Sequence, residues 1–254
     1  MLFTFEKTIY MHPLLESIFN TRKFTTKTGE VVEVNSETSK NQCAFLQQII
    51  KDNKFKNSIE IGLAFGMSAL AITEEVVKNG GKHLTIDKFE NNGWHGYGLD
   101  LLEQANLRDQ VEFHEEFCYI TLPQLLAQDR KFDFAYIDST KQFDWLLVDF
   151  FYLDKLLEIN GVIVFDDAAF PGIRKLLRFI SQFPNYEIYS HYPSNKPESD
   201  SSKIKLFKKL FSNANNILKE ELIHSDYELG VNTYCLALRK ISEDTRNWDW
   251  HVNF

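Results

Sequence analysis

The sequence contains few of the residues that define several special classes of protein. Of its 254 residues, only 3 are cysteine, 6 are proline and 11 are glycine. The glycine and proline contents exclude a collagen-like chain, and an aromatic content of 14% argues against intrinsic disorder. No apolar run approaches the roughly 18 residues that a membrane-spanning helix needs. A chain of this size can bury a hydrophobic core without disulfides or a structural metal.

Cysteines and positive charges are also too few for a disulfide-stabilised protein, a cysteine metal site or a general binder of anionic partners. Cys43, Cys118 and Cys235 are odd in number and widely spaced, which suits neither a disulfide framework nor a cysteine metal site. We therefore expect a reducing, cytoplasmic location. Lysine and arginine total 28 against 36 acidic residues, a net charge of −8. This balance argues against nucleic acid and against anionic membranes as partners.

Short apolar runs alternate with helical patterns from residue 58 onward, and this alternation is typical of βαβ units and a parallel sheet. Strands are expected at 58–62, 83–87, 111–114, 132–138, 161–165, 186–191 and 232–239. Helices are expected at 40–53, 67–79, 98–106, 119–129, 143–157, 171–182 and 203–222. The sequence therefore predicts one α/β domain with helices on both faces of the sheet.

The first of these strands ends in a glycine turn that runs from Glu60 to Ser68 and contains Gly62 and Gly66. A strand, a glycine turn and a helix N-terminus form the ligand crevice of a doubly wound sheet. The dinucleotide pattern G-x-G-x-x-G fails here, because Ala64 and Met67 occupy two of its glycine positions. The Glu60 carboxylate suits a ligand with a cationic end better than a pyrophosphate.

A second acid strengthens this interpretation of the turn. Asp87 closes the second strand, where its carboxylate can accept hydrogen bonds from the ribose hydroxyls of a nucleoside. Glu60, the glycine turn and Asp87 together predict a site for an adenosine that carries a cationic amino-acid tail. The alternative is an ordinary turn with a solvated acid beside it.

These residues resemble the cofactor motifs of class I S-adenosylmethionine-dependent methyltransferases, at 58–70 and 83–87. The stretch 132–167 resembles the fourth-to-fifth-strand segment of small-molecule O-methyltransferases. Bacterial methyltransferases of unassigned substrate are similar in the Trp94-His95-Gly96 stretch and in the aromatic tail. The resemblance covers about residues 36–190 and weakly 230–254.

The resemblance implies a Rossmann-like class I methyltransferase fold, a doubly wound, mostly parallel seven-stranded sheet whose last strand is antiparallel. Within it we expect one domain over 1–254, divided into an N-terminal helical extension (1–57), a cofactor-binding core (58–192), an insertion (193–230) and the last strand with the aromatic tail (231–254). S-adenosylmethionine is the implied cofactor. Its expected contacts are Glu60, Gly62, Ala64, Phe65, Gly66, Ser68, Asp87 and Asp138.

Three acids follow the fourth and fifth strands of the expected sheet: Asp138, Asp166 and Asp167. The carboxyl ends of adjacent parallel strands line one crevice, and a cluster of carboxylates suits Mg²⁺ or another hard divalent cation. Catechol O-methyltransferase is similar in this pattern. In the alternative interpretation the acids cap helices or are solvated. Because clustered carboxylates repel one another, removal of Asp166 is expected to leave the fold intact or slightly more stable.

Lys141 follows Asp138 by three residues. The resemblance implies that it is a catalytic general base toward a metal-bound hydroxyl, together with Asp138 at the reacting centre. A lysine can do this only if its pKa is lowered toward neutrality. The alternative is a solvated loop lysine. Trp94 and His95 are further candidates for contact with the acceptor.

The expected function is transfer of a methyl group from S-adenosylmethionine to a small-molecule acceptor, at a hydroxyl oxygen, with a divalent cation as an optional participant. The alternatives are an NAD-dependent oxidoreductase and a non-catalytic cofactor-binding protein on the same scaffold, which fold alone does not exclude. The expected partner is the acceptor, and a homodimer is left open.

Overall fold

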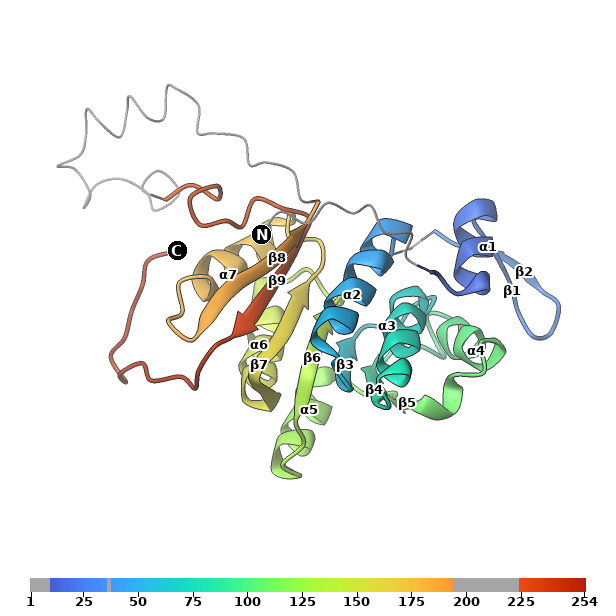
Figure 1. Ribbon diagram of the computed structural model, residues 1–254, viewed down its shortest axis with the longest axis horizontal. Helices are drawn as coiled ribbons and strands as arrows, with labels where there is room; N and C mark the ends of the chain where they lie inside the picture. The colour runs from blue at the N-terminus through green and yellow to red at the C-terminus, as the bar shows by residue number, and fades with distance from the viewer. Residues whose placement is uncertain (1–9, 36–37, 194–223) are drawn as a thin grey trace, which may run out of the picture.

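A computed structural model of the chain describes residues 10–35, 38–193 and 224–254. In this part of the chain the central sheet has seven strands in the order β5-β4-β3-β6-β7-β9-β8 (Figure 1). Their bounds are β3 Asn57–Ile61, β4 Lys82–Ile86, β5 Val111–His114, β6 Phe132–Ile137, β7 Leu157–Phe165, β8 Tyr186–Tyr192 and β9 Cys235–Lys240. Only β9 runs antiparallel to its two neighbours, β7 and β8. The expected doubly wound, mostly parallel sheet is confirmed.

Six helices cover the two faces of this sheet in the described residues (Figure 1). On one face lie α2 (Lys40–Asn53), α3 (Met67–Lys78) and α4 (Tyr97–Gln104), and on the other α5 (Cys118–Ala127), α6 (Phe143–Leu156) and α7 (Pro171–Ile180). Successive side chains of a strand point to opposite faces. Ile59 and Ile61 therefore pack with α5, α6 and α7, whereas Phe134 and Tyr136 pack with α2 and α3.

The N-terminal region contains more structure than the expected helical extension. Helix α1 (Pro13–Thr21) is followed by a hairpin of β1 (Lys23–Thr25) and β2 (Val31–Glu33). Outside this region, a short 3-10 helix, η1 (Arg108–Gln110), lies between α4 and β5. Strands of three residues leave no clear alternation in the sequence, so the hairpin was not predicted. A hydrophobic cluster joins α1 and the hairpin to α3 and α4. The expected helix 203–222 lies outside the described residues.

The start of β7 differs from expectation, whereas α2 begins and ends where the sequence predicts. Strand β7 begins at Leu157, directly after α6. The sequence predicts a later start because the exposed Glu158–Asn160 segment near the beginning of the strand interrupts its apolar pattern. Helix α2 begins after Ser39, whose hydroxyl accepts a hydrogen bond from Gln42 N while the Gln42 side chain accepts one from Ser39 N. No helix in the described ranges is long and apolar enough to cross a membrane.

Candidate active site

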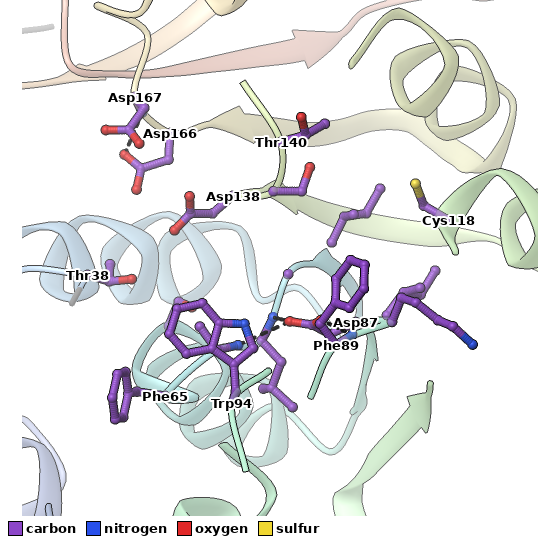
Figure 2. A pocket seen from close by; sticks show the side chains of 18 of the residues that line it. Thr38, Phe65, Asp87, Phe89, Trp94, Cys118, Asp138, Thr140, Asp166 and Asp167 are labelled. Carbon is purple, nitrogen blue, oxygen red and sulfur yellow. Dashed lines mark hydrogen bonds between the residues drawn. The ribbon is translucent and has the colours of Figure 1, made fainter. Parts of the chain in front are cut away.

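A cavity of about 670 Å³ opens at the carboxyl ends of β3, β4, β6 and β7. Most of the residues predicted for the site line it: Gly62, Ala64, Phe65, Gly66, Ser68, Asp87, Asp138, Lys141, Asp166 and Asp167. Figure 2 shows the three acids from β6 and β7 gathered on one side, with Asp87 and Phe89 on the other. The sheet thus brings the cofactor motifs and the acid cluster into one cavity.

Both glycines of the turn are required by the approach of other segments of the chain. Gly62 and Gly66 have φ values of +99° and +72°, in the left-handed region that favours glycine. A Cβ at Gly66 would lie 2.8 Å from the Cα of Gly98, at the start of α4. A Cβ at Gly62 would collide with the carbonyl oxygen of Asp138. The turn therefore fixes the position of Asp138 relative to β3.

Asp87 shapes the turn from the neighbouring strand. Its Oδ2 accepts hydrogen bonds from Leu63 N at 2.9 Å and Ala64 N at 3.2 Å, and its Oδ1 accepts one from Phe89 N at 2.8 Å. These bonds hold Ala64 at a φ of +49°. A carboxylate offers about four acceptor positions, so Asp87 retains about one for a ligand hydroxyl.

Glu60 was predicted to contact the cofactor, and the structure places it elsewhere. Its side chain is completely buried and does not line the cavity. Glu60 has the same strand parity as the residues that face α2 and α3, so its carboxylate points beneath these helices and not out of the strand end. There it lies 3.2 Å from His83 Nε2, and His83 Nδ1 lies 2.8 Å from the Ser58 hydroxyl. Glu60 is part of a buried polar chain between β3 and β4.

Asp166 is saturated by donors from the protein. Its Oδ1 accepts hydrogen bonds from Gln42 Nε2, Cys235 Sγ and Asp167 N, at 2.8, 2.9 and 2.8 Å. Its Oδ2 accepts one from the Tyr136 hydroxyl at 2.8 Å. Only 4% of Asp166 is exposed. Although Asp166 lines the cavity, its carboxylate is therefore already engaged by four donors of the protein.

Lys141 lies between the other two acids. Its Nζ is 2.8 Å from Asp138 Oδ1 and 2.8 Å from Asp167 Oδ2. Burial opposes the charged form of the lysine, but the two carboxylates outweigh it and raise its pKa above the ordinary value. A general base needs a lowered pKa. The structure therefore argues against the predicted role of Lys141 as a general base.

The pKa of Asp138 changes in the direction that a proton acceptor requires. Burial raises it, the charge of Asp166 raises it further, and Lys141 opposes both effects. Asp138 follows β6 directly, and its N–H continues the ladder by donating to Ile61 O. A carboxylate with a raised pKa at this position is the better candidate for the base.

The metal-binding prediction does not fit these contacts. Within the described ranges, no group of three histidine, cysteine or acidic side chains is arranged to hold a metal ion. Asp166 is occupied by its four donors, and the ammonium of Lys141 bridges the remaining carboxylates of Asp138 and Asp167. We derive no chemical step from a metal.

An aromatic wall on the β4 and β5 side of the cavity was not predicted. The rings of Phe89 and Phe117 meet edge to face at 5.9 Å, and Phe117 contacts Trp145 at 6.2 Å. All three line the cavity. Aromatic residues beside strand ends usually contribute to packing, so the sequence alone gave no reason to select them. Phe89 and Phe117 follow the ends of β4 and β5, which is the only signal the sequence offers for them, whereas Trp145 lies in the first turn of α6.

Other lining residues come from distant parts of the chain. Trp94, a predicted acceptor contact, lines the cavity and packs edge to face on Phe65 at 5.7 Å, whereas His95 faces a separate hollow beside the hairpin. Asn35 and Tyr234 were not predicted. Partial burial, followed by the charge of Asp167, raises the pKa of Tyr234 to about 12. Its phenol therefore stays protonated at neutral pH.

Known proteins of one class are similar to this chain in sequence and in fold. Residues 59–168 match the model of a methyltransferase domain family. This match and the sheet order confirm the resemblance to class I methyltransferases, whose fold the chain adopts. The matched segment contains the glycine turn, Asp87 and all three acids of the cluster.

Individual relatives are consistent with this class. The chain is 30% identical over 158 residues to caffeoyl-CoA O-methyltransferase 2 of Petunia hybrida, an alignment covering 58% of this chain and 63% of that protein. It is 28% identical over 162 residues to caffeoyl-CoA O-methyltransferase 1 of Arabidopsis thaliana, covering 58% and 59%. The chain thus spans less than two thirds of the length of these relatives.

Solved structures show the same fold. A Bacillus cereus O-methyltransferase in complex with SAH superposes with a TM-score of 0.58 at 22% identity, covering 71% of this chain and 84% of that one. The O-methyltransferase TomG from Streptomyces achromogenes, in complex with SAM, superposes with a TM-score of 0.57 at 16% identity, covering 71% and 82%.

Proposed function

We propose that this chain transfers a methyl group from S-adenosylmethionine to a hydroxyl oxygen of a small-molecule acceptor. The observation that carries the proposal is the meeting of Gly62, Gly66, Asp87 and Asp138 in one cavity at the strand ends. The relatives' names, which are those of O-methyltransferases, support the choice of oxygen as the acceptor atom.

The cavity suits the adenosine part of this cofactor. The free acceptor position of Asp87 is available to a ribose hydroxyl, and the neighbouring rings of Phe89 and Phe117 offer an aromatic surface for the adenine. Gly62 and Gly66 add no side chains between the turn and the ligand. These residues form the nucleoside end of the proposed site.

The electrostatics suit the amino-acid part. Asp138, Asp166 and Asp167 contribute three carboxylates against the single ammonium of Lys141, so this end of the cavity is negative. A ligand with a sulfonium and an ammonium group is positively charged. Charge complementarity of this kind favours S-adenosylmethionine over its neutral product and over pyrophosphate cofactors.

Bound S-adenosylmethionine supplies a methyl group that the acceptor oxygen attacks in line, forming an O–C bond while the C–S electron pair remains on sulfur. The protein's task is positioning together with removal of one proton. Asp138 accepts the hydroxyl proton, consistent with its raised pKa, and passes it to solvent. Lys141, already protonated and paired, is not the base in this proposal.

Ligand binding separates this function from the NAD-dependent alternative. S-adenosylhomocysteine at 100 times its dissociation constant should stabilise the fold by about 2.7 kcal/mol, measured as a shift in thermal unfolding, and NAD should give no shift. Stabilisation by NAD alone would overturn the proposal. Tight S-adenosylhomocysteine binding without transfer to any hydroxyl acceptor would instead support a non-catalytic binding protein.

A further inference from the structure

Both the side chain and the backbone of Lys141 are held by contacts within the protein. Its ammonium bridges Asp138 and Asp167 at 2.8 Å each, which joins the ends of β6 and β7. Behind it, Gly172 in the first turn of α7 lies directly against the Lys141 carbonyl oxygen, where a Cβ would collide. The Lys141 side chain is therefore part of a defined bridge between two strand ends.

The bridge leaves one donor of the ammonium group available. An ammonium has three N–H donors, and the two carboxylates accept from two of them. The side chain of Lys141 lines the cavity and remains 30% exposed. The third N–H can therefore donate to a ligand atom in the cavity.

The same geometry places a positive charge where a divalent cation would need to bind. Such a cation requires several oxygen ligands with free lone pairs. Asp166 has none to spare, because Gln42, Cys235, Tyr136 and the Asp167 N–H occupy it. Asp138 and Asp167 remain, and both already face the ammonium.

We infer that the ammonium of Lys141 replaces the divalent cation in this site and binds the acceptor oxygen through its third N–H, so that methyl transfer is independent of metal. This inference rests on the proposed function. The acceptor oxygen gains negative charge as its proton leaves to Asp138, and a fixed cationic donor stabilises that charge. Lys141 keeps its three protons throughout. The O–C bond still forms as the C–S bond breaks, and Asp138 still accepts the hydroxyl proton.

The chemistry of the bridge favours phenols as the acceptor class. Without a metal to acidify it, a phenolic hydroxyl loses its proton far more easily than an aliphatic one. Trp94, whose ring faces the cavity, offers an apolar surface for an aromatic acceptor (Figure 2). We therefore assign to Lys141 the role of positioning a phenolic oxygen and stabilising its charge.

Direct metal binding tests the replacement without an acceptor. Electron paramagnetic resonance of Mn²⁺ should show no tightly bound ion on the wild-type protein, either alone or saturated with S-adenosylhomocysteine. One Mn²⁺ bound per chain and lost in Asp138→Asn would overturn the inference. Since Asp138→Asn retains a side chain of the same size, folding is checked by circular dichroism on the same sample.

A chromophoric phenol tests the donor role. The visible spectrum of nitrocatechol distinguishes its ionised and neutral forms. In the presence of a chelator, wild-type protein should bind it ionised, Lys141→Arg should retain this spectrum, and Lys141→Met should lose it. Transfer to nitrocatechol should also slow by about 10²–10³-fold in Lys141→Met. Identical spectra for Lys141→Met and wild type, or failure of the wild type to bind nitrocatechol, would contradict the assignment.

Failure of the inference can be distinguished from failure of the proposed function. Calorimetry with S-adenosylhomocysteine in chelator tests the function alone. Binding of this ligand together with tight Mn²⁺ binding would refute the metal-independent bridge and leave the methyltransferase function intact. No binding of S-adenosylhomocysteine would refute the proposed function.

Discussion

The side-chain amide of Gln42 donates hydrogen bonds to both carboxylate oxygens of Asp166, at 2.8 and 3.1 Å, across 124 residues of sequence. The contact ties the first turn of α2 to the end of β7. Tyr136 and Cys235 donate to the same carboxylate from β6 and β9. Asp166, which lines the cavity, therefore joins one helix and three strands.

Removal of this carboxylate should destabilise the protein. Asp166→Ala leaves the buried Gln42 and Tyr136 donors without an acceptor, which should lower the free energy of unfolding by about 1–3 kcal/mol. Denaturant unfolding measures the difference. The exposed Asp109 provides a control, since Asp109→Ala should change stability by less than about 0.5 kcal/mol. An Asp166→Ala variant that is as stable as wild type, or more stable, would instead support the expectation from the sequence that repulsion between the clustered carboxylates dominates.

The sheet and most of the cavity were predictable from local patterns. Apolar runs such as 134–137 and 162–165 have the length and spacing of buried parallel strands, and the glycine turn and Asp87 fall at strand ends by position alone. These features depend on residues near one another in the sequence. Their placement in the cavity then follows from parallel topology.

The roles of individual side chains in the cavity required tertiary contacts. Lys141 can serve as a base only if it is unpaired, and its bridge to Asp167 spans 26 residues of sequence. From the sequence alone, Asp166 is a candidate metal ligand. Its hydrogen-bond partner Gln42 lies in α2, far away in the sequence, and only the structure identifies the contact. Glu60 lies one residue before a strand end, and its strand parity decides which face it occupies.

The glycine turn should tolerate a methyl group less well than an open glycine position. Gly66→Ala places its Cβ 2.8 Å from the Gly98 Cα, whereas Gly80, with a similar φ of +77°, has no atom within 4 Å. Gly80→Ala should therefore cost only the left-handed strain, about 1–2 kcal/mol. Gly66→Ala should cost more and should also weaken S-adenosylhomocysteine binding measured by calorimetry. Equal effects of the two substitutions would contradict this account of the turn.

The aromatic wall should contribute to nucleoside binding. Phe89→Ala removes a ring that faces the cavity, and loss of base stacking typically costs about 1–3 kcal/mol. Calorimetry should show S-adenosylhomocysteine binding weakened by that amount. Phe151→Ala, at an exposed ring on α6 outside the cavity, is the matched control and should bind like wild type. The adenine assignment fails if both variants retain wild-type affinity.

Glu90 should make stability depend on pH. Its side chain is completely buried and accepts hydrogen bonds from Gly98 N and Leu99 N; burial raises its pKa from the ordinary 4.5 to about 8. The folded state then holds a proton that the unfolded state has lost. This contribution to stability is fully present below pH 4.5 and is lost as the pH rises to about 8.

Glu90→Gln keeps an acceptor for both N–H groups but cannot ionise. We expect the variant to be more stable than wild type at pH 8, with a difference that shrinks as the pH falls toward 4.5. Urea unfolding at a series of pH values provides the measurement. A difference between the two proteins that is constant with pH would show that Glu90 has an ordinary pKa.

Transfer of a labelled methyl group is the most direct test of the central claim. Wild-type protein is incubated with S-adenosylmethionine labelled in the methyl group, a chelator and a panel of phenols, and label is counted in the isolated products. The account predicts label on a phenolic oxygen together with equimolar S-adenosylhomocysteine. Absence of label from every phenol of the panel, with S-adenosylmethionine shown to be bound, would contradict it.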